Sequence, residues 1–202
     1  HYPLRRQRQM CIRDRNKMDE FKVLIQKSYD FILALATPLT VGLIFTSPSV
    51  ILLLSGESFA PAILTSQIVA LNILMVGISG VMGLQVLYPM GRINIVILCT
   101  FIGAVVNVVL NVLLIPVYGH NGTAVAYMLA EVAVTVSMFI VGRRYIPIQF
   151  FKKQHFHYIG GGIVMGGFLY FISLLGLSNI YTLITMILSL IHISEPTRPI
   201  SI

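Results

Sequence analysis

Residues 107–131, NVVLNVLLIPVYGHNGTAVAYMLAE, carry the pattern that decides the fold. An apolar run ends at Pro116, a polar turn follows at residues 118–122, and a second apolar run begins at once. Apolar segments of about 20 residues are long enough to cross the hydrocarbon core of a bilayer as helices. The stretch therefore predicts two consecutive transmembrane helices joined by a short turn.

The rest of the chain repeats this alternation of apolar run and short polar turn. The composition agrees, since 56% of residues are hydrophobic and 10% are charged, whereas soluble domains carry about 25% charge. We expect an all-α, polytopic membrane helical bundle of five to six transmembrane helices, with a cytoplasmic or interfacial lead-in at 16–30 and a transmembrane lobe at 31–187. The predicted spans are 31–54, 62–87, 95–115, 123–141, 158–175 and 179–187 onward.

Two features inside the spans and turns affect the expected geometry. Pro38 should kink the first span, because proline removes a backbone donor and clashes with the preceding turn, and Pro48 is a second candidate break. Residues 142–157, GRRYIPIQFFKKQHFH, are basic and aromatic, and we expect them to lie along the membrane face.

Lysine and arginine predict the orientation, because they are enriched in cytoplasmic loops. They occur in the lead-in, in the turn after the second span and after the fourth span, whereas the turns after the first, third and fifth spans have none. This alternation predicts that residues 16–27 and 142–157 are cytoplasmic and that the turn at His120 faces outward.

Both ends of the chain differ from the remainder. Residues 5–15, RRQRQMCIRDR, and 188–198, LSLIHISEPTR, resemble translations of the paired adapters of transposase-based sequencing. We therefore expect segments 1–15 and 188–202 not to be native; the alternative is a basic tail and an ordinary last helix. Without the basic and acidic residues of these segments the formal charge falls from +7 to about +3, so the high isoelectric point does not indicate a nucleic-acid partner.

The opening stretch resembles a motif of oligosaccharide flippases, "N…NLLLIPxYGxxGAA", and departs from it at Thr123. Residues 52–60 resemble the "LLFGxxYxxA" turn of the same family, 85–92 resemble "QxLxxxGR", and Pro38-Leu39 matches its "LP". The four motifs occur in the family's order over about residues 29–146. The family belongs to the multidrug/oligosaccharidyl-lipid/polysaccharide exporter superfamily.

This resemblance implies most of the C-terminal lobe of a two-lobed, alternating-access transporter in the bacterial inner membrane. The implied partners are the lipid bilayer, an undecaprenyl-pyrophosphate-linked oligosaccharide and a missing N-terminal lobe. No cofactor is expected, and whether transport is coupled to a proton or sodium gradient stays open. A peptidoglycan lipid-precursor flippase and a multidrug or cation antiporter are the alternatives within the superfamily. A membrane glycosyltransferase or polymerase is the alternative of another class, and the absence of acids from residues 142–157 disfavours an enzyme.

Five polar residues are the candidates for lining a transport cavity. Glu131 is an acid deep in a span, where a charge is costly, so such residues usually face a cavity or a partner. We interpret it as a cavity-facing proton or cation site or as a hydrogen-bonding group for sugar; the alternative is a structural carboxylate bonded to a neighbouring helix. Asn107 and Asn111 share one helical face and, like Gln85, could bind sugar hydroxyls or pack between helices. The guanidinium of Arg92 matches phosphate geometry and could meet a pyrophosphate near the cytoplasmic entrance; the alternative is a plain orientation anchor, which requires no substrate contact.

A metal site is not expected. Cys99 is the one cysteine left once the ends are set aside, and one cysteine supports neither a disulfide framework nor a metal site. His155 and His157 form a potential metal pair, but the sequence supplies no further ligands beside them.

Overall fold

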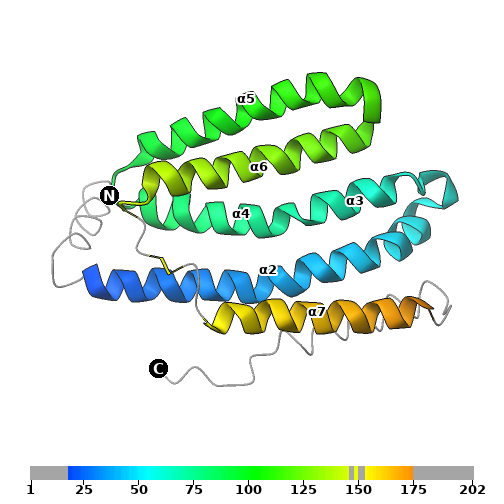
Figure 1. Cartoon of the computed structure of the whole chain (residues 1–202), viewed down its shortest axis with the longest axis horizontal. Coiled ribbons are helices and arrows are strands. Elements are labelled where there is room, and N and C mark those ends of the chain that lie inside the picture. Colours follow the sequence, from blue (N-terminus) through cyan, green and yellow to red (C-terminus); the bar gives the residue numbers. More distant parts are fainter. Residues whose placement is uncertain (1–17, 146–147, 150–152, 175–202) are drawn as a thin grey trace, which may run out of the picture.

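A computed structural model of the chain describes residues 18–145, 148–149 and 153–174 (Figure 1). The expectations for the adapter-like ends and for the sixth span lie outside these residues. The described part is helical without strands, and four of its helices are long and apolar enough to cross a membrane, with a shorter apolar segment at residues 160–171. The predicted all-α class and partial helical bundle are confirmed.

The helices lie side by side with their axes roughly aligned, in the order α5, α6, α3–α4, α2 and α7 across the molecule (Figure 1). Each helix therefore contacts mainly the next one in this order. The bounds are α2 Met18–Ser55, η2 Glu57–Phe59, α3 Ala62–Ala70, α4 Asn72–Gly80, η3 Val81–Leu87, α5 Ile93–Tyr118, α6 His120–Gly142 and α7 Lys153–Leu174.

Helix α2 joins the expected lead-in to the first span without interruption. Its 38 residues extend about 57 Å at 1.5 Å per residue, well beyond a hydrocarbon core of about 30 Å. Phe21, Ile25 and Tyr29 are buried in a cluster with residues of η3, α5 and α6, which explains why the helix continues through the lead-in. Pro38 and Pro48 both lie inside α2, and the C-terminal part of the helix curves away from the first half (Figure 1).

The second span, Ala62–Leu87, consists of α3, α4 and η3. η3 is a π-helical segment, and the Tyr88 amide donates to the Gly83 carbonyl oxygen at 2.9 Å, one residue further back than in an α-helix. Single π-helical turns within α-helices frequently occur at functional sites. This departure places Gln85 on an irregular part of the span.

The turn between α5 and α6 is shorter than the expected 118–122, because α5 continues through Pro116 to Tyr118 and α6 begins at His120. Gly119 alone separates them, with φ 56° and ψ −132°, a conformation that side chains with a Cβ strongly disfavour. A Cβ on Gly122 would lie 2.5 Å from the Leu114 carbonyl oxygen. Both glycines therefore allow the close approach of the two helices.

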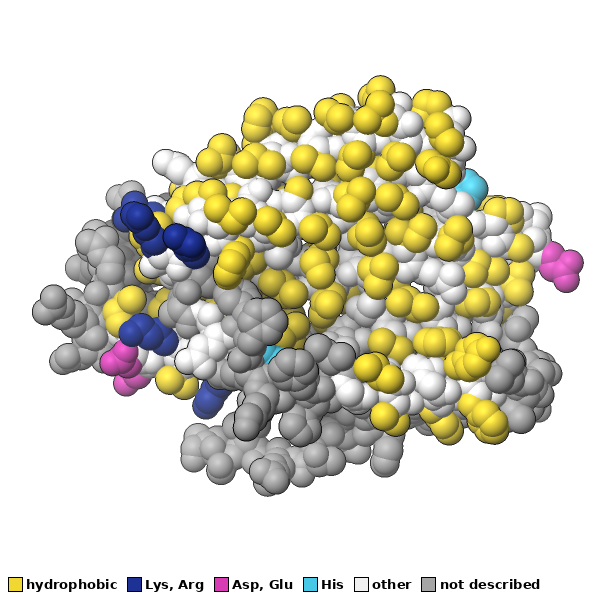
Figure 2. Space-filling model, in the orientation of Figure 1, with side chains coloured by type: hydrophobic (Ala, Val, Ile, Leu, Met, Phe, Trp, Pro, Cys, Tyr) yellow, Lys and Arg dark blue, Asp and Glu magenta, His cyan; other side chains and the backbone are white. Residues whose placement is uncertain are grey.

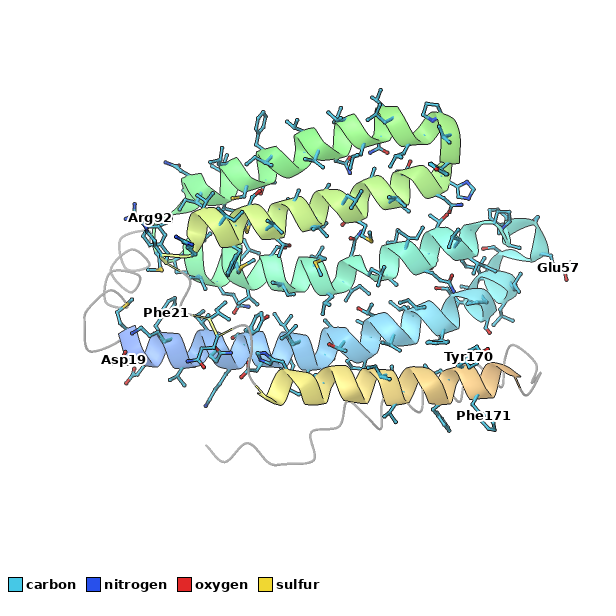
Figure 3. The ribbon with its side chains drawn as sticks, viewed as in Figure 1. Asp19, Phe21, Glu57, Arg92, Tyr170 and Phe171 are labelled. Atoms are coloured by element: carbon cyan, nitrogen blue, oxygen red, sulfur yellow. The ribbon has the colours of Figure 1, made fainter. Side chains whose placement is uncertain are left out.

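The expected membrane-face segment at 142–157 is also shorter, because α7 begins at Lys153. Lysine and arginine side chains of the described part gather at one end of the bundle, which we name the basic end, whereas Glu57 marks the opposite end (Figures 2 and 3). The basic end is formed by the start of α2, the end of η3 and the end of α6, and it carries Lys22, Lys27, Arg92, Arg143 and Arg144. Hydrophobic side chains cover the visible flank between the ends (Figure 2).

Candidate functional site

Asn107 and Asn111 line a shallow groove of about 380 Å³ on the surface of α5. The groove is completed by apolar side chains of the same helix: Val108, Val112, Ile115 and Pro116. The Asn111 Nδ2 atom donates to the Asn107 carbonyl oxygen at 2.9 Å and to Asn107 Oδ1 at 3.0 Å. The two asparagines therefore form one polar unit within an apolar surface.

The hydrogen-bonding capacity of this unit is incomplete. Asn111 Oδ1 is buried and has no hydrogen-bond partner in the described part of the chain. A buried acceptor left unpaired costs about 1–3 kcal/mol. The asparagines bond to one another rather than to a neighbouring helix, so the alternative of an interhelical contact receives no support from these bonds.

Glu131 lies on α6, near the middle of the hairpin that α6 forms with α5, and its side chain is half-buried. The adjacent Ala130 carbonyl oxygen would lie 3.3 Å from a Cβ on Gly103, which places Glu131 near the level of residues 103–107 of α5. The Glu131 carbonyl oxygen accepts a 2.9 Å bond from the Thr135 hydroxyl. Among the described residues no hydrogen bond to its carboxylate is found.

Arg92 is exposed at the basic end, where its guanidinium lies 4.6 Å from the ring centroid of Tyr145 (Figure 3). Arg92 immediately precedes α5 and Asn107 follows 15 residues later, a rise of about 22 Å. The cation–π contact gives Arg92 a structural partner. The structure thus separates Arg92 from the asparagine unit by most of a membrane thickness.

Gln85 lies in the π-helical segment η3 and is half-buried, with no side-chain hydrogen bond among the described residues. It is seven residues before Arg92, close to the basic end. The five candidates therefore do not form one cluster. Asn107 and Asn111 are in contact, Glu131 lies near their level, and Gln85 and Arg92 belong to the basic end.

Two buried polar residues were missed by the sequence analysis. Asn72 is 3% exposed and Thr40 is 6% exposed, and the side-chain oxygen and nitrogen atoms of Asn72 and the hydroxyl of Thr40 all lack hydrogen-bond partners in the part that the structure describes. The signal for Asn72 was present in the sequence, since it is an amide inside the apolar run ALNILMVG.

A second polar cluster joins α2 to α7. The His155 Nε2 atom lies 2.9 Å from Asp30 Oδ1, and the same oxygen accepts a 2.7 Å bond from Gln26 Nε2. The Gln26 Oε1 atom accepts a 2.8 Å bond from the Gln149 amide. Within the described residues no group of three or more His, Cys, Asp or Glu side chains suits a metal ion, and the structure gives His155 a carboxylate partner instead.

Comparison with known proteins assigns the family. The family model described as "Lipid II flippase MurJ" matches residues 11–193, which include all the described helices. Searches of the curated proteins and of the solved structures found no match. The matched family is one of transporters rather than enzymes, and the apolar helices of the described part agree with a multi-pass membrane protein. A match over nearly the whole chain shows that this protein belongs to the lipid II flippase MurJ family.

Proposed function

We propose that this chain is part of a transporter that moves lipid II, a lipid-linked peptidoglycan precursor, across the bacterial inner membrane. The observation that carries the proposal is the family match over residues 11–193. It favours the peptidoglycan-precursor alternative over the lipid-linked oligosaccharide that the motifs of residues 29–146 first suggested.

The chemistry of the two candidate regions supports a substrate with a sugar and a pyrophosphate. Carboxamides such as those of Asn107 and Asn111, which line the groove on α5, donate to and accept from sugar hydroxyls. Arg92 gives the basic end a donor that suits phosphate oxygens. A second lobe of the same protein, facing α5, would close the groove into a cavity.

The orientation follows from the distribution of charge. The basic end would face the cytoplasm, because lysine and arginine are retained there, and the turn at Gly119 would face outward. Substrate would then meet Arg92 first and Asn107 later, and Glu131 would lie between the two membrane surfaces. Arg92 serves in this proposal both as an orientation anchor and as a first contact for pyrophosphate.

Direct binding of lipid II to the 202-residue chain tests the proposal. The chain, purified in detergent, would be titrated with lipid II, with an undecaprenyl-pyrophosphate-linked oligosaccharide and with undecaprenyl phosphate, and complexes would be counted by native mass spectrometry. We expect lipid II to bind at least about tenfold more tightly than undecaprenyl phosphate, a difference of about 1.4 kcal/mol.

The comparison of substrates decides between the two flippase functions. Preference for the linked oligosaccharide over lipid II would overturn the proposal and restore the function that the four motifs suggest. Equal binding of all three lipids would mean that the chain recognises only the polyprenyl phosphate and would also contradict a lipid II site. Variants Arg143→Gln and Arg144→Gln separate general attraction to anionic lipid from selective binding, because they should weaken all three complexes alike.

A further inference from the structure

Asn72 is the most deeply buried polar side chain in the described part that has no partner at all. Its relative exposure is 3%, and neither Oδ1 nor Nδ2 makes a hydrogen bond there. Leaving buried donors and acceptors unpaired costs about 1–3 kcal/mol for each group. An unsatisfied amide in the middle of a span therefore points to a bound species or to a neighbour that changes its state.

Two contacts between α6 and the second span show which of their residues lie at the same depth along the bundle axis, referred to below as one level. The Thr65 hydroxyl donates to Asn121 Oδ1 at 2.6 Å near the Glu57 end of the bundle. Nearer the basic end, the Thr135 hydroxyl lies 3.5 Å from the Met75 carbonyl oxygen. The residue numbers rise together along both helices, so the second span and α6 run parallel.

Asn72 and Glu131 occupy equivalent places between these two contacts. Asn72 is three residues before Met75 on α4, and Glu131 is one turn before Thr135 on α6. One turn is about 5.4 Å along either helix. Both residues therefore lie at one level, on the sides by which α4 and α6 contact each other.

Thr40 of α2 extends this level to a third helix. The Ser47 hydroxyl bonds to that of Ser66 at 3.0 Å, so this side of α2 faces the second span. Thr40 is seven residues before Ser47 and shares its helical face. Its hydroxyl is buried without a partner, as is the side chain of Asn72.

The ligand best matched to the Glu131 carboxylate at this level is a proton. A carboxylate inside a bilayer is costly, and adding one proton removes the charge. A neutral carboxyl donates one hydrogen bond, whereas a carboxylate only accepts. Asn72 offers both an acceptor and a donor, so its amide can satisfy Glu131 in either state.

The other titratable groups near this level are few. Tyr127 lies one turn from Glu131 on α6 and is 39% exposed, and Cys99 is buried on α5 closer to the basic end. Asp30 is ten residues before Thr40 on α2, about 15 Å along the helix. Within the described residues, Glu131 is the acid of this level.

We propose that Glu131 and Asn72 form a reversible proton-binding site between α6 and α4, with Thr40 as a further hydrogen-bonding group from α2. In the protonated state the carboxyl donates to Asn72 Oδ1. In the ionised state the carboxylate accepts from Asn72 Nδ2. A role for this proton in driving transport rests on the proposed function, whereas the binding of the proton does not.

Infrared difference spectroscopy of the chain in lipid nanodiscs tests the site directly. Titration with pH should show a protonated-carboxyl band that disappears in Glu131→Gln. In Asn72→Leu the band should remain and its midpoint should rise by about one pH unit, a tenfold higher proton affinity, because the charged form loses the stronger hydrogen bond. Asn72→Ser retains a donor and an acceptor and should give a smaller shift.

Ser79→Ala is the matched control. Ser79 is also a buried polar residue of α4, but its hydroxyl donates to the Val76 carbonyl oxygen at 3.2 Å and lies two turns from Asn72. This variant should leave the midpoint unchanged. The proposal would be overturned if Asn72→Leu left the midpoint unchanged or if the band remained in Glu131→Gln. Helical content measured by circular dichroism verifies that each variant is folded.

Replacement of NaCl by choline chloride at constant ionic strength distinguishes proton binding at this site from metal-cation binding. A midpoint that moves with sodium would mean that the site takes a metal cation, which contradicts the proposal. If the band titrates as expected while lipid II does not bind, the proton site stands and the proposed substrate fails.

Discussion

His155 Nε2 lies 2.9 Å from Asp30 Oδ1, and this contact joins the first turn of α7 to α2 near the basic end of the bundle. Both side chains are well shielded, with exposures of 7% for His155 and 19% for Asp30. The ring of Tyr29 meets the imidazole edge-on, with centroids 5.5 Å apart. Farther along, α7 contacts α2 through Val41 and Phe45.

Replacing His155 by phenylalanine should loosen α7 from α2. The variant retains an aromatic ring beside Tyr29 but removes the nitrogen that contacts Asp30, and loss of a buried hydrogen bond to a charged group costs about 1.5–3 kcal/mol. Hydrogen–deuterium exchange of the amides of α7 should accelerate, while exchange in α5 and α6 should not change.

Lys22→Ala provides the control for this prediction. Lys22 and Asp19 also form a contact of 2.9 Å, but their side chains are 50% and 87% exposed. Exposed pairs contribute about 0–1 kcal/mol, so this variant should leave exchange in α7 unchanged. Equal effects of the two variants would show that general charge at this end, rather than the buried contact, positions α7.

Gly119→Ala should destabilise the α5–α6 hairpin. Gly119 has φ 56° and ψ −132°, and holding a residue with a Cβ in such a conformation costs about 1–3 kcal/mol. The midpoint of thermal unfolding should fall. Gly80→Ala is the matched substitution: a Cβ there meets open space, and alanine favours a helix over glycine by about 1 kcal/mol. A midpoint that falls for Gly80→Ala but not for Gly119→Ala would contradict this account of the turn.

Asn111→Leu should weaken substrate binding while changing the stability of the fold little. The leucine removes an unpaired buried oxygen at the cost of two hydrogen bonds to Asn107, so the free energy of unfolding should change by less than about 1 kcal/mol. If the groove binds sugar, lipid II affinity should fall about fivefold to tenfold in the native mass spectrometry titration. Asn94→Leu, an exposed position at the opposite end of α5, should retain normal affinity. Unchanged binding by Asn111→Leu would remove the asparagine unit from the candidate site.

The sequence predicted the helices well because the length of each apolar run and the positions of the charged residues between the runs are local properties. Residues 62–87 and 95–115 appeared as apolar runs, and Arg92 between them already indicated a common basic end. The partners of buried polar groups were not predictable in this way. Asp30 and His155 are 125 residues apart, and the shared level of Asn72 and Glu131 depends on how α4 and α6 are aligned. The π-helical segment around Gln85 contacts α2, α5 and α6, and no local pattern encodes these contacts.

The orientation of the bundle can be tested by labelling single cysteines with a membrane-impermeant maleimide. His120 and Arg144 are exposed at opposite ends of α6, so His120→Cys and Arg144→Cys report on opposite membrane surfaces. The variants are made in a Cys11→Ser background, where Cys99 is buried and should not react. In intact bacterial cells His120→Cys should be labelled, and Arg144→Cys should be labelled only after permeabilisation.

Glu57→Cys is the matched position for this experiment, because it lies at the same end as His120 but follows a different helix (Figure 3). It should behave as His120→Cys does if α2 and α6 both cross the bilayer. The reverse pattern at all three positions would place the basic end outside, which the enrichment of lysine and arginine in cytoplasmic loops argues against. In that case Arg92 could not meet a substrate arriving from the cytoplasm, and its contact with Tyr145 would be the one role left to it.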